Sequence, residues 1–491
     1  MTSSILKTTT FLFLLVGLIT LCEPAQSLQS PNRSINIPKV WDDEALASME
    51  LPLANSESSP KHVASDYYYR IPVRSIYKSY PVYAPGREPS GYMDYLAGQE
   101  PEAAFDPATL TSAEDWVRAG EIVFDAPIGY GATFKLSQVR DPAWYRENSI
   151  PLTMDGIMPF SRYVVRKKGT VEVGGGACLM CHARIMPDGT LLKGAQGNFP
   201  VDRAIAYNLR DQASRTPNPQ SLLDAIRLGQ RTFFSTPWLK PNPIDAVDTM
   251  TLEQIASVYG SIPAGVTTRV NLSLFQPAQI PDLIGVKDVR HLDHTGMVIQ
   301  RSVGDLMRYV ALVQGTNSFD RFGSFALLNP LPDPKNLERY SDEQMYALAM
   351  FLYSLKPPEN PNKATAVSER GRRVFTTEGC VNCHTPPLYT SNKLTPAEGF
   401  EVPAEHLRKY DIIERSVGTD PRLALQTRKA TGYYKVPSLR GVWYRGPLEH
   451  NGGAPSLESW FDPNRSLKGH PFGLKLSPVD RSALIAFLRT L

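Results

Sequence analysis

Two copies of one short pattern, Cys-x-x-Cys-His, constrain this chain more than any other feature of its sequence. The two copies occupy the following positions: Cys178, Cys181 and His182 in GGGACLMCHARIMPDG, then Cys380, Cys383 and His384 in GCVNCHTPPLYTSNKLTP. Two thiols at this spacing can bond to the two vinyl groups of a haem, while the histidine places an imidazole under the iron. The sequence therefore predicts two covalently attached haem c groups, with His182 and His384 as iron ligands.

Other uses of the pattern explain less of it. A zinc ribbon has its two CxxC pairs about 15–20 residues apart, far closer than Cys178 and Cys380. A redox-active pair or a local disulfide would leave the histidine after each pair without a purpose. The chain has only five Cys and eight His among 491 residues. Two complete copies of the pattern therefore do not arise by chance.

The N-terminal stretch MTSSILKTTTFLFLLVGLITLCEPAQSLQS has the layout of a secretory signal peptide. Lys7 precedes an apolar run over residues 11–21, and Ala25-Gln26-Ser27 supplies small residues for cleavage. The run is shorter than the about 20 apolar residues that a membrane span needs. We expect residues 1–27 to be removed, which leaves a protein of the periplasm or cell envelope without a membrane span. A retained anchor and lipidation of Cys22 are the alternatives.

Export also bears on the cysteines and the partners. Exported proteins normally pair their cysteines in disulfides, yet all four cysteines beyond Cys22 belong to the two motifs. The net charge of +3 gives no reason to expect a nucleic acid as partner. We expect a small electron-donor or acceptor protein instead, such as a cytochrome or a cupredoxin.

An internal repeat indicates how the chain is divided. Residues 341–355 (SDEQMYALAMFLYSL) align without a gap on residues 477–491 (SPVDRSALIAFLRTL). Both segments begin with a helix-capping serine, and the apolar residues of the first recur at i, i+3 and i+4, so each is predicted to form a helix. A shorter match joins Gly120-x-x-Val-Phe to Gly371-x-x-Val-Phe. Each haem motif is therefore expected to lie between an opening and a closing helix.

The fold predicted from these signals is mostly α, with two c-type cytochrome domains, long irregular loops and an N-terminal extension. Forty-two prolines support the irregular connections. We expect these boundaries: signal peptide 1–27, irregular extension 28–107, first cytochrome domain 108–358 with an insertion at 125–175, and second cytochrome domain 359–491.

The second domain resembles the bacterial di-haem cytochrome c peroxidase superfamily, which includes the methylamine-utilisation di-haem enzyme and, distantly, the rubber oxygenases. The residues that carry the resemblance follow the second haem motif in the family's order: Val436-Pro437-Ser438-Leu439-Arg440, His450-Asn451-Gly452 and Ser456-Leu457-Glu458. The resemblance implies an N-terminal haem, held by His182, that can bind peroxide. It also implies a C-terminal haem, held by His384, that relays electrons to the first.

The chain departs from that family where the peroxidases carry a tryptophan between the haems, followed by a catalytic Gln and Glu. Residues 290–311 stand in this place, with Leu292 at the position of the tryptophan. We therefore expect slow peroxide turnover. His294 and Arg301 are the candidate catalytic residues, the first as a source of protons and the second as a partner of an anion or a propionate.

The sixth ligand of each iron decides whether that haem is open to a small oxidant. No methionine follows Met350, so the second haem is expected to take a histidine. The candidate is His470 by its position before the final helix, with His450 as the alternative. For the first haem the candidates are His291, His294 and Met297, each of which can also be an ordinary loop residue.

Three functions fit these expectations. The first is a peroxidase-like oxidoreductase that reduces hydrogen peroxide at the first haem with electrons from the second. The second is a plain electron-transfer cytochrome without its own substrate, and the third is an oxygenase of an organic substrate. Fold resemblance alone does not choose among them.

Overall fold

The computed structural model describes residues 35–131 and 134–491, of which residues 37–491 form one contact unit. The predicted signal peptide and Cys22 lie outside the described residues. Across the described ranges, no helix combines the length and the apolar character that a membrane crossing requires.

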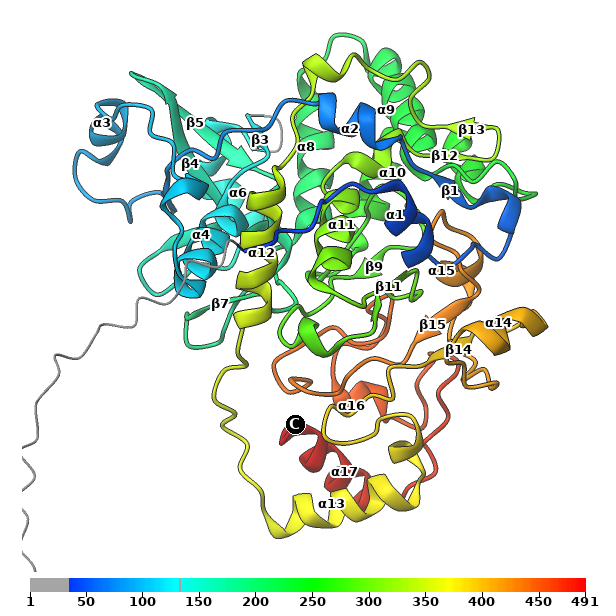
Figure 1. Ribbon diagram of the computed structural model, residues 1–491. Helices are drawn as coiled ribbons and strands as arrows, with labels where there is room; N and C mark the ends of the chain where they lie inside the picture. Colours follow the sequence, from blue (N-terminus) through cyan, green and yellow to red (C-terminus); the bar gives the residue numbers. More distant parts are fainter. Residues whose placement is uncertain (1–34, 132–133) are drawn as a thin grey trace, which may run out of the picture. The chain divides into compact units, whose positions relative to one another are not determined.

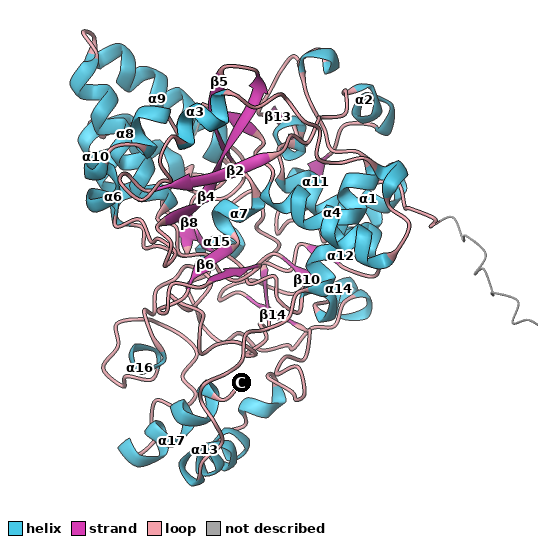
Figure 2. Cartoon of the chain, turned by 90° about the vertical axis from the view of Figure 1, so that its left-hand side faces the viewer, coloured by secondary structure: helices cyan, strands magenta, loops and turns pink. Residues whose placement is uncertain are grey.

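Two pairs of helices enclose the two haem motifs in the sequence, as the repeat predicts. Helix α4 (Ala113–Asp125) packs against α12 (Asp342–Ser354), and α13 (Ala366–Thr377) packs against α17 (Pro478–Arg489). Both pairs are visible side by side in Figures 1 and 2. Phenylalanines meet at each crossing, with ring centroids 5.2 Å apart between α4 and α12 and 5.3 Å apart between α13 and α17.

The predicted helix starts are confirmed. Ser341 caps α12 and forms a capping box with Gln344, so two backbone donors at the helix start are satisfied. Ser477 caps α17 and accepts a hydrogen bond from the backbone N–H of Asp480, with Pro478 at the first helical position.

The prediction of a mostly α fold is wrong. Helices account for 39% of the structure and strands for 13%, and the strands form several sheets. The largest has the order β2-β4-β5-β3 and is formed by these antiparallel strands: β2 (Ser79–Tyr83), β4 (Ile157–Lys167), β5 (Thr170–Gly175) and β3 (Gly129–Tyr130). Figure 2 shows β2, β4 and β5 as magenta arrows.

Three strands of this sheet, β3, β4 and β5, lie in the predicted insertion over residues 125–175. Strands β4 and β5 pair as a hairpin whose turn is Lys168-Gly169, with Gly169 at a φ of +81°. Buried apolar side chains along β4 have no helical period, because one face of the sheet and much of the other are covered. Strand β2 comes from the N-terminal segment, so the insertion and the extension form one sheet.

The N-terminal segment is part of the main hydrophobic core. Its elements are α1 (Asp43–Met49), β1 (Pro60–Lys61), α2 (Ser65–Arg70), β2 and α3 (Tyr92–Ala97). Trp41 is fully buried, stacks on Tyr68 with ring centroids 4.5 Å apart, and donates its indole N–H to the carbonyl oxygen of Val63 (2.8 Å). The aromatic residues of this segment therefore serve as packing groups.

A buried ion cluster fastens the same segment. His62 lies between Glu50 (Nε2 to Oε2, 3.0 Å) and Asp320 (Nδ1 to Oδ1, 2.8 Å). Burial by itself would lower the pKa of His62, but the two carboxylates outweigh it and raise that pKa to about 11. Burial raises the pKa of Asp320 to about 6 in spite of the nearby imidazolium. At neutral pH the cluster is therefore an imidazolium between two carboxylates.

The remaining elements are short or lie between α4 and α12 in the sequence. The helices are α5 (Leu136–Val139), α6 (Pro142–Asn148), α7 (Cys178–Cys181), α8 (Val201–Arg215), α9 (Pro219–Phe234), α10 (Leu252–Ser261), α11 (Val303–Val313), α14 (Ala404–Lys409), α15 (Arg422–Leu425) and α16 (Leu457–Trp460). The two-stranded ribbons are β6 (Ala183–Ile185) with β7 (Leu191–Lys193), β8 (Val266–Thr267) with β9 (Ala278–Gln279), β10 (His291–Leu292) with β11 (Val298–Ile299), and β14 (Leu394–Pro396) with β15 (Tyr433–Lys435). A three-stranded sheet has the order β1, β12 (Arg321–Phe322) and β13 (Phe325–Ala326).

Candidate haem-binding sites

The first Cys-x-x-Cys-His motif forms a single helical turn. Helix α7 spans Cys178–Cys181, directly after strand β5, and Gly176 at a φ of +77° redirects the chain between them. The backbone N–H of His182 donates to the carbonyl oxygen of Cys178 (2.8 Å) and closes the turn. Both cysteines are free thiols, partly exposed, on the same turn. This arrangement holds two thiols and one imidazole close together, as haem attachment requires.

The side chain of His182 is oriented for binding a metal. Its Nδ1–H donates to the carbonyl oxygen of Pro281 (3.0 Å), which leaves Nε2 available. Burial, helped by the positive charge of Arg269, lowers the pKa of His182 to about 4. The imidazole is therefore neutral at physiological pH, the form in which histidine binds a metal, and a backbone acceptor on the far nitrogen is the usual support of such a ligand.

The second motif has the same local geometry. A short 3₁₀ turn, η7 (Cys380–Asn382), follows Gly379 at a φ of +75°, and the N–H of His384 donates to the carbonyl oxygen of Cys380 (2.9 Å). The Nδ1 of His384 lies 3.1 Å from the carbonyl oxygen of Pro437 and 3.2 Å from that of Tyr389. Burial lowers the pKa of His384 as well. Each motif therefore presents a neutral imidazole whose Nε2 is free.

The rings of His470 and His384 lie at a centroid separation close to that of two imidazoles bound to one iron. The two ring centroids are 6.5 Å apart. An iron bound at about 2 Å by one nitrogen of each ring would hold the centroids about 6.3 Å apart. The Nδ1 of His470 is buried without a hydrogen-bond partner among the described residues. Burial, and next the nearby His384, lowers the pKa of His470 to about 3. The ring is therefore neutral at physiological pH, the form in which histidine binds a metal.

The alternative ligand, His450, is engaged elsewhere. Its ring stacks on Tyr434, with centroids 4.4 Å apart and planes inclined by 26°. The hydroxyl of Tyr434 donates to the carbonyl oxygen of Asp420 (2.5 Å), so its oxygen accepts from the Nε2–H of His450 (3.2 Å). Another histidine, His406, makes a similar contact with the hydroxyl of Tyr433 (2.9 Å). Of the three histidines proposed or available for the second iron, only His470 is recorded within ring-contact distance of His384.

Polar contacts, several of them with other segments, hold the loop over residues 290–301 in place. His294 donates its Nε2–H to the carbonyl oxygen of Gln279 (2.6 Å), and the Nδ1 of His291 lies 3.3 Å from the carbonyl oxygen of Gly296. Met297 belongs to the main hydrophobic core. Asp293 accepts from Lys429 (2.5 Å) and from the hydroxyl of Tyr309 (2.9 Å). Burial lowers the pKa of both histidines, to about 4 for His291.

Arg301 faces a carboxylate. Its guanidinium and its backbone N–H both bind Asp305 at the start of α11, at distances of 2.9 to 3.2 Å, and the side chain is 47% exposed. No recorded contact joins Arg301 to either haem motif in the described residues. Asp305 is the charge that favours the N-terminus of α11, and the guanidinium of Arg301 is occupied as the partner of this carboxylate.

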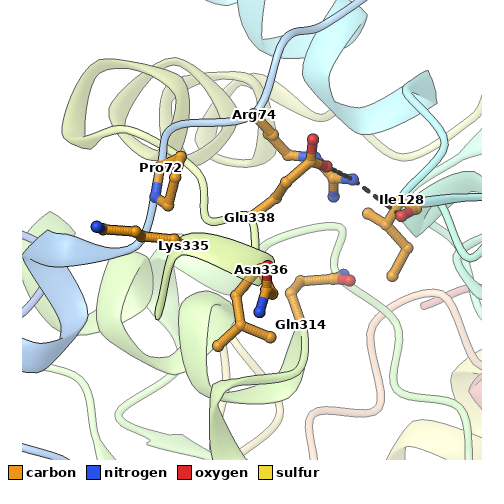
Figure 3. Close-up of a pocket in the computed structure, with 8 residues that line it drawn as sticks. Pro72, Arg74, Ile128, Gln314, Lys335, Asn336 and Glu338 are labelled. Carbon is orange, nitrogen blue, oxygen red and sulfur yellow. Dashed lines mark hydrogen bonds and ion pairs between the residues drawn. The ribbon is translucent and has the colours of Figure 1, made fainter. Parts of the chain in front are cut away.

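Arg269 and a nearby pocket were missed by the sequence analysis. The charge of Arg269 bears on all three residues of the first motif, Cys178, Cys181 and His182. A pocket of about 580 Å³ is lined by Gln314, whose Nε2 lies 3.5 Å from the Sγ of Cys178. Figure 3 shows Gln314 facing the pocket opposite Arg74. No local sequence pattern marks Arg269 or Gln314, because each lies near the first motif only through contacts between segments far apart in the sequence.

The donor sets of both motifs fit a haem c. Two thiols, one neutral imidazole and a supported Nδ1 occur in each, and the second adds an imidazole at iron-bridging distance. Within the part of the chain that the structure describes, no group of three His, Cys, Asp or Glu side chains is placed to hold a metal ion without such a cofactor.

Comparison with known proteins gives only distant matches. No protein-family model and no curated protein matches the sequence. Hydrazine synthase of Kuenenia stuttgartiensis, in a structure pressurised with 20 bar xenon, is 16% identical with a TM-score of 0.32, covering 58% of this chain and 92% of that chain. A MauG-like protein associated with microbial copper homeostasis is 14% identical with a TM-score of 0.28, covering 55% and 88%.

Proposed function

We propose that this chain is an exported di-haem c-type cytochrome with peroxidase-like activity. One haem c is bound to Cys178 and Cys181 with His182 as ligand, and the other to Cys380 and Cys383 with His384 as ligand. The observation that carries the proposal is the separation of 6.5 Å between the rings of His384 and His470. Two partly buried neutral imidazoles at this distance, one directly behind a CxxC pair, suit a six-coordinate haem iron.

The second haem is the relay in this proposal. His384 and His470 would be the two histidine ligands of its iron, and a haem held in this way would pass electrons and not bind a substrate. Hydrogen bonds fix both histidines. The backbone N–H of His470 donates to the carbonyl oxygen of Val417 (2.5 Å), and two carbonyl oxygens lie within hydrogen-bond distance of the Nδ1 of His384. Electrons would enter from a small exported protein such as a cytochrome or a cupredoxin.

The first haem is the reactive one. A haem iron with a free sixth position can bind a small oxidant, and reducing hydrogen peroxide to two water molecules consumes two electrons and two protons. A pocket lined by Gln314 supports this assignment, because the Nε2 of Gln314 lies 3.5 Å from the Sγ of Cys178 and a small molecule needs an entry near the haem. Arg269 bears on the same motif, and its guanidinium can bind a propionate or a bound anion.

Haem analysis of the mature protein tests the proposal. We expect two haems per chain that stay attached after denaturation and acid-acetone extraction. Replacing Cys380 and Cys383 by Ala should leave one. Haem that extracts freely from the wild-type protein, or zinc in place of haem, would end the proposal.

The spin state of the ferric protein distinguishes the functions. One high-spin and one low-spin haem signal in electron paramagnetic resonance would support the peroxidase-like activity. Two low-spin signals would favour a plain electron-transfer cytochrome. An oxygenase would need an organic substrate that changes the high-spin signal on binding.

A further inference from the structure

The two histidines of the haem motifs donate hydrogen bonds from Nδ1–H to two segments that meet in the structure. His182 donates to Pro281, and His384 lies within hydrogen-bond distance of Pro437. The residue after each acceptor is polar: Asp282 follows the first and Ser438 follows the second. The two acceptors are therefore fixed in place by whatever holds Asp282 and Ser438.

Asp282 is a buried carboxylate that joins these segments. Its side chain is 6% exposed. The hydroxyl of Tyr444 donates to its Oδ2 (2.7 Å), the N–H of Ile284 donates to its Oδ1 (2.8 Å), and the Nε of Arg445 lies 3.9 Å away. Burial raises the pKa of Asp282, while Arg445 and the Tyr444 hydroxyl oppose that shift. A buried carboxylate with these partners is satisfied, and costly to alter.

Arg445 carries the connection to the second motif. Its Nη2 donates to the carbonyl oxygen of Ser438 (2.7 Å), directly after Pro437. The same arginine faces Asp282, so one side chain touches both acceptor segments. Arg184 lies two residues after His182. Burial lowers the pKa of Arg184, and the negative charge of Asp282 opposes that shift. Its guanidinium donates to the carbonyl oxygen of Gly446 (3.4 Å). The two haem motifs are thus connected through one carboxylate and two arginines.

We propose that Asp282 is a positioning residue for both haem-binding histidines, and that it couples the two haems by fixing both Nδ1 acceptors and by placing one negative charge between the motifs. The inference rests on the proposed function, since it assumes a haem at each motif. Hydrogen bonds to the far nitrogen of a ligating histidine set its orientation and basicity. His384 has a second acceptor in the carbonyl oxygen of Tyr389 (3.2 Å). Through the segments of Pro281 and Pro437, one carboxylate would therefore act on both irons.

Asp282→Asn tests the proposal in the full-length protein with haem bound. The variant keeps the size of the side chain and removes its charge. Because a nearby negative charge favours the ferric form, we expect the reduction potentials of both haems to rise, measured by optical redox titration. Both ferric resonance signals should shift as well. Tyr444→Phe, which removes only the hydroxyl that donates to Asp282, should shift both signals by less.

Asp288→Asn is the matched control. Asp288 lies on the same segment and pairs with Arg440 (3.6 Å), but both side chains are about half exposed, so solvent screens the charge. It should leave both potentials unchanged. Two bound haems with unchanged potentials and signals in both Asp282→Asn and Tyr444→Phe would overturn the inference and leave the proposed function intact, as would a change at one haem alone. Should Asp282→Asn not fold, Tyr444→Phe decides by the same criterion. Wild-type protein without covalent haem would instead overturn the proposed function.

Discussion

A Cβ atom at Gly371 would lie 1.9 Å from the carbonyl oxygen of Ala483, so α13 and α17 cross there with backbone against backbone. The relation is repeated in the other helix pair, where a Cβ atom at Gly120 would lie 1.9 Å from the carbonyl oxygen of Ala347. The sequence repeat aligns the same residues. The two haem motifs are therefore served by two copies of one helix crossing, and each crossing depends on a residue without a side chain.

Replacing Gly371 by Ala should destabilise the second helix pair. No contact closer than about 3 Å can be tolerated against backbone atoms, so α13 must move away from α17. We expect the free energy of unfolding to fall by about 3 kcal/mol, the upper part of the range for overpacked sites, measured by chemical denaturation.

Gly229→Ala is the control for this prediction. Gly229 lies inside α9, and a Cβ atom there would meet nothing within 4 Å. This change should stabilise the protein by about 0.5–1 kcal/mol, because alanine favours the helix. A Gly371→Ala protein as stable as the wild type would show that the crossing adapts.

The helix pairs could be predicted from the sequence because their signals are local. Ser341 and Ser477 mark helix starts within three residues, and apolar residues repeat with the helical period. The sheet could not be predicted in the same way. Its central hairpin, β4 with β5, carries one local signal, the turn Lys168-Gly169, and the pairing of β2 with β4 joins segments far apart in the sequence.

The residues of the candidate site also differ in whether a local sequence pattern marks them. The CxxCH turns follow from their own residues, and the choice of His470 followed from its place before the last helix. The roles of Arg269 and Asp282 depend on contacts with segments far away in the sequence, such as Asp282 with Tyr444. No local pattern marks such residues, because ordinary loop positions carry the same residue types.

His470→Ala should open the second haem iron. Since His384 and His470 lie at the separation of a shared iron, the wild-type haem should be low-spin, without the weak far-red band of methionine-ligated haem. The variant should become high-spin or bind added ligands such as cyanide or imidazole, measured by absorption and electron paramagnetic resonance.

His450→Ala is the comparison for this variant. Its ring is bound to Tyr434, so the second haem should stay low-spin. An open iron after His450→Ala alone would mean that the ligand is His450. An iron that stays closed in both variants would require a donor such as Tyr444 or a methionine from the first part of the chain.

Peroxide turnover should be slow and should depend on His294 more than on Arg301. Burial lowers the pKa of His294, so at neutral pH the ring is neutral and its free Nδ1 can accept a proton but not donate one. His294→Ala should lower turnover with a small electron donor by at least about tenfold, the low end for loss of an acid-base group, without lowering haem content. Arg301→Ala should leave turnover unchanged, because Arg301 is bound to Asp305. Equal losses in both variants would contradict these assignments.

His62→Gln should remove a pH-dependent part of the stability. The folded pKa of His62 is about 11, against 6.5 for the unfolded chain, so the folded protein holds the extra proton between these values. The stabilisation is fully present below pH 6.5 and is lost as the pH rises toward 11, by up to about 1.4 kcal/mol per pH unit. At pH 6 the variant should be less stable by about 3–5 kcal/mol, the usual cost of breaking a buried ion pair.

The difference between wild type and His62→Gln should therefore shrink steadily when unfolding is measured at pH 6, 8 and 10. His406→Gln provides the control, because His406 is equally buried but burial lowers its pKa. Its imidazole is neutral in both the folded and the unfolded chain above pH 6.5, so the difference between wild type and His406→Gln should stay constant from pH 8 to pH 10. A constant difference for His62→Gln over the same interval would show that His62 is not protonated between Glu50 and Asp320, and that hydrogen bonds of a neutral ring hold the N-terminal segment.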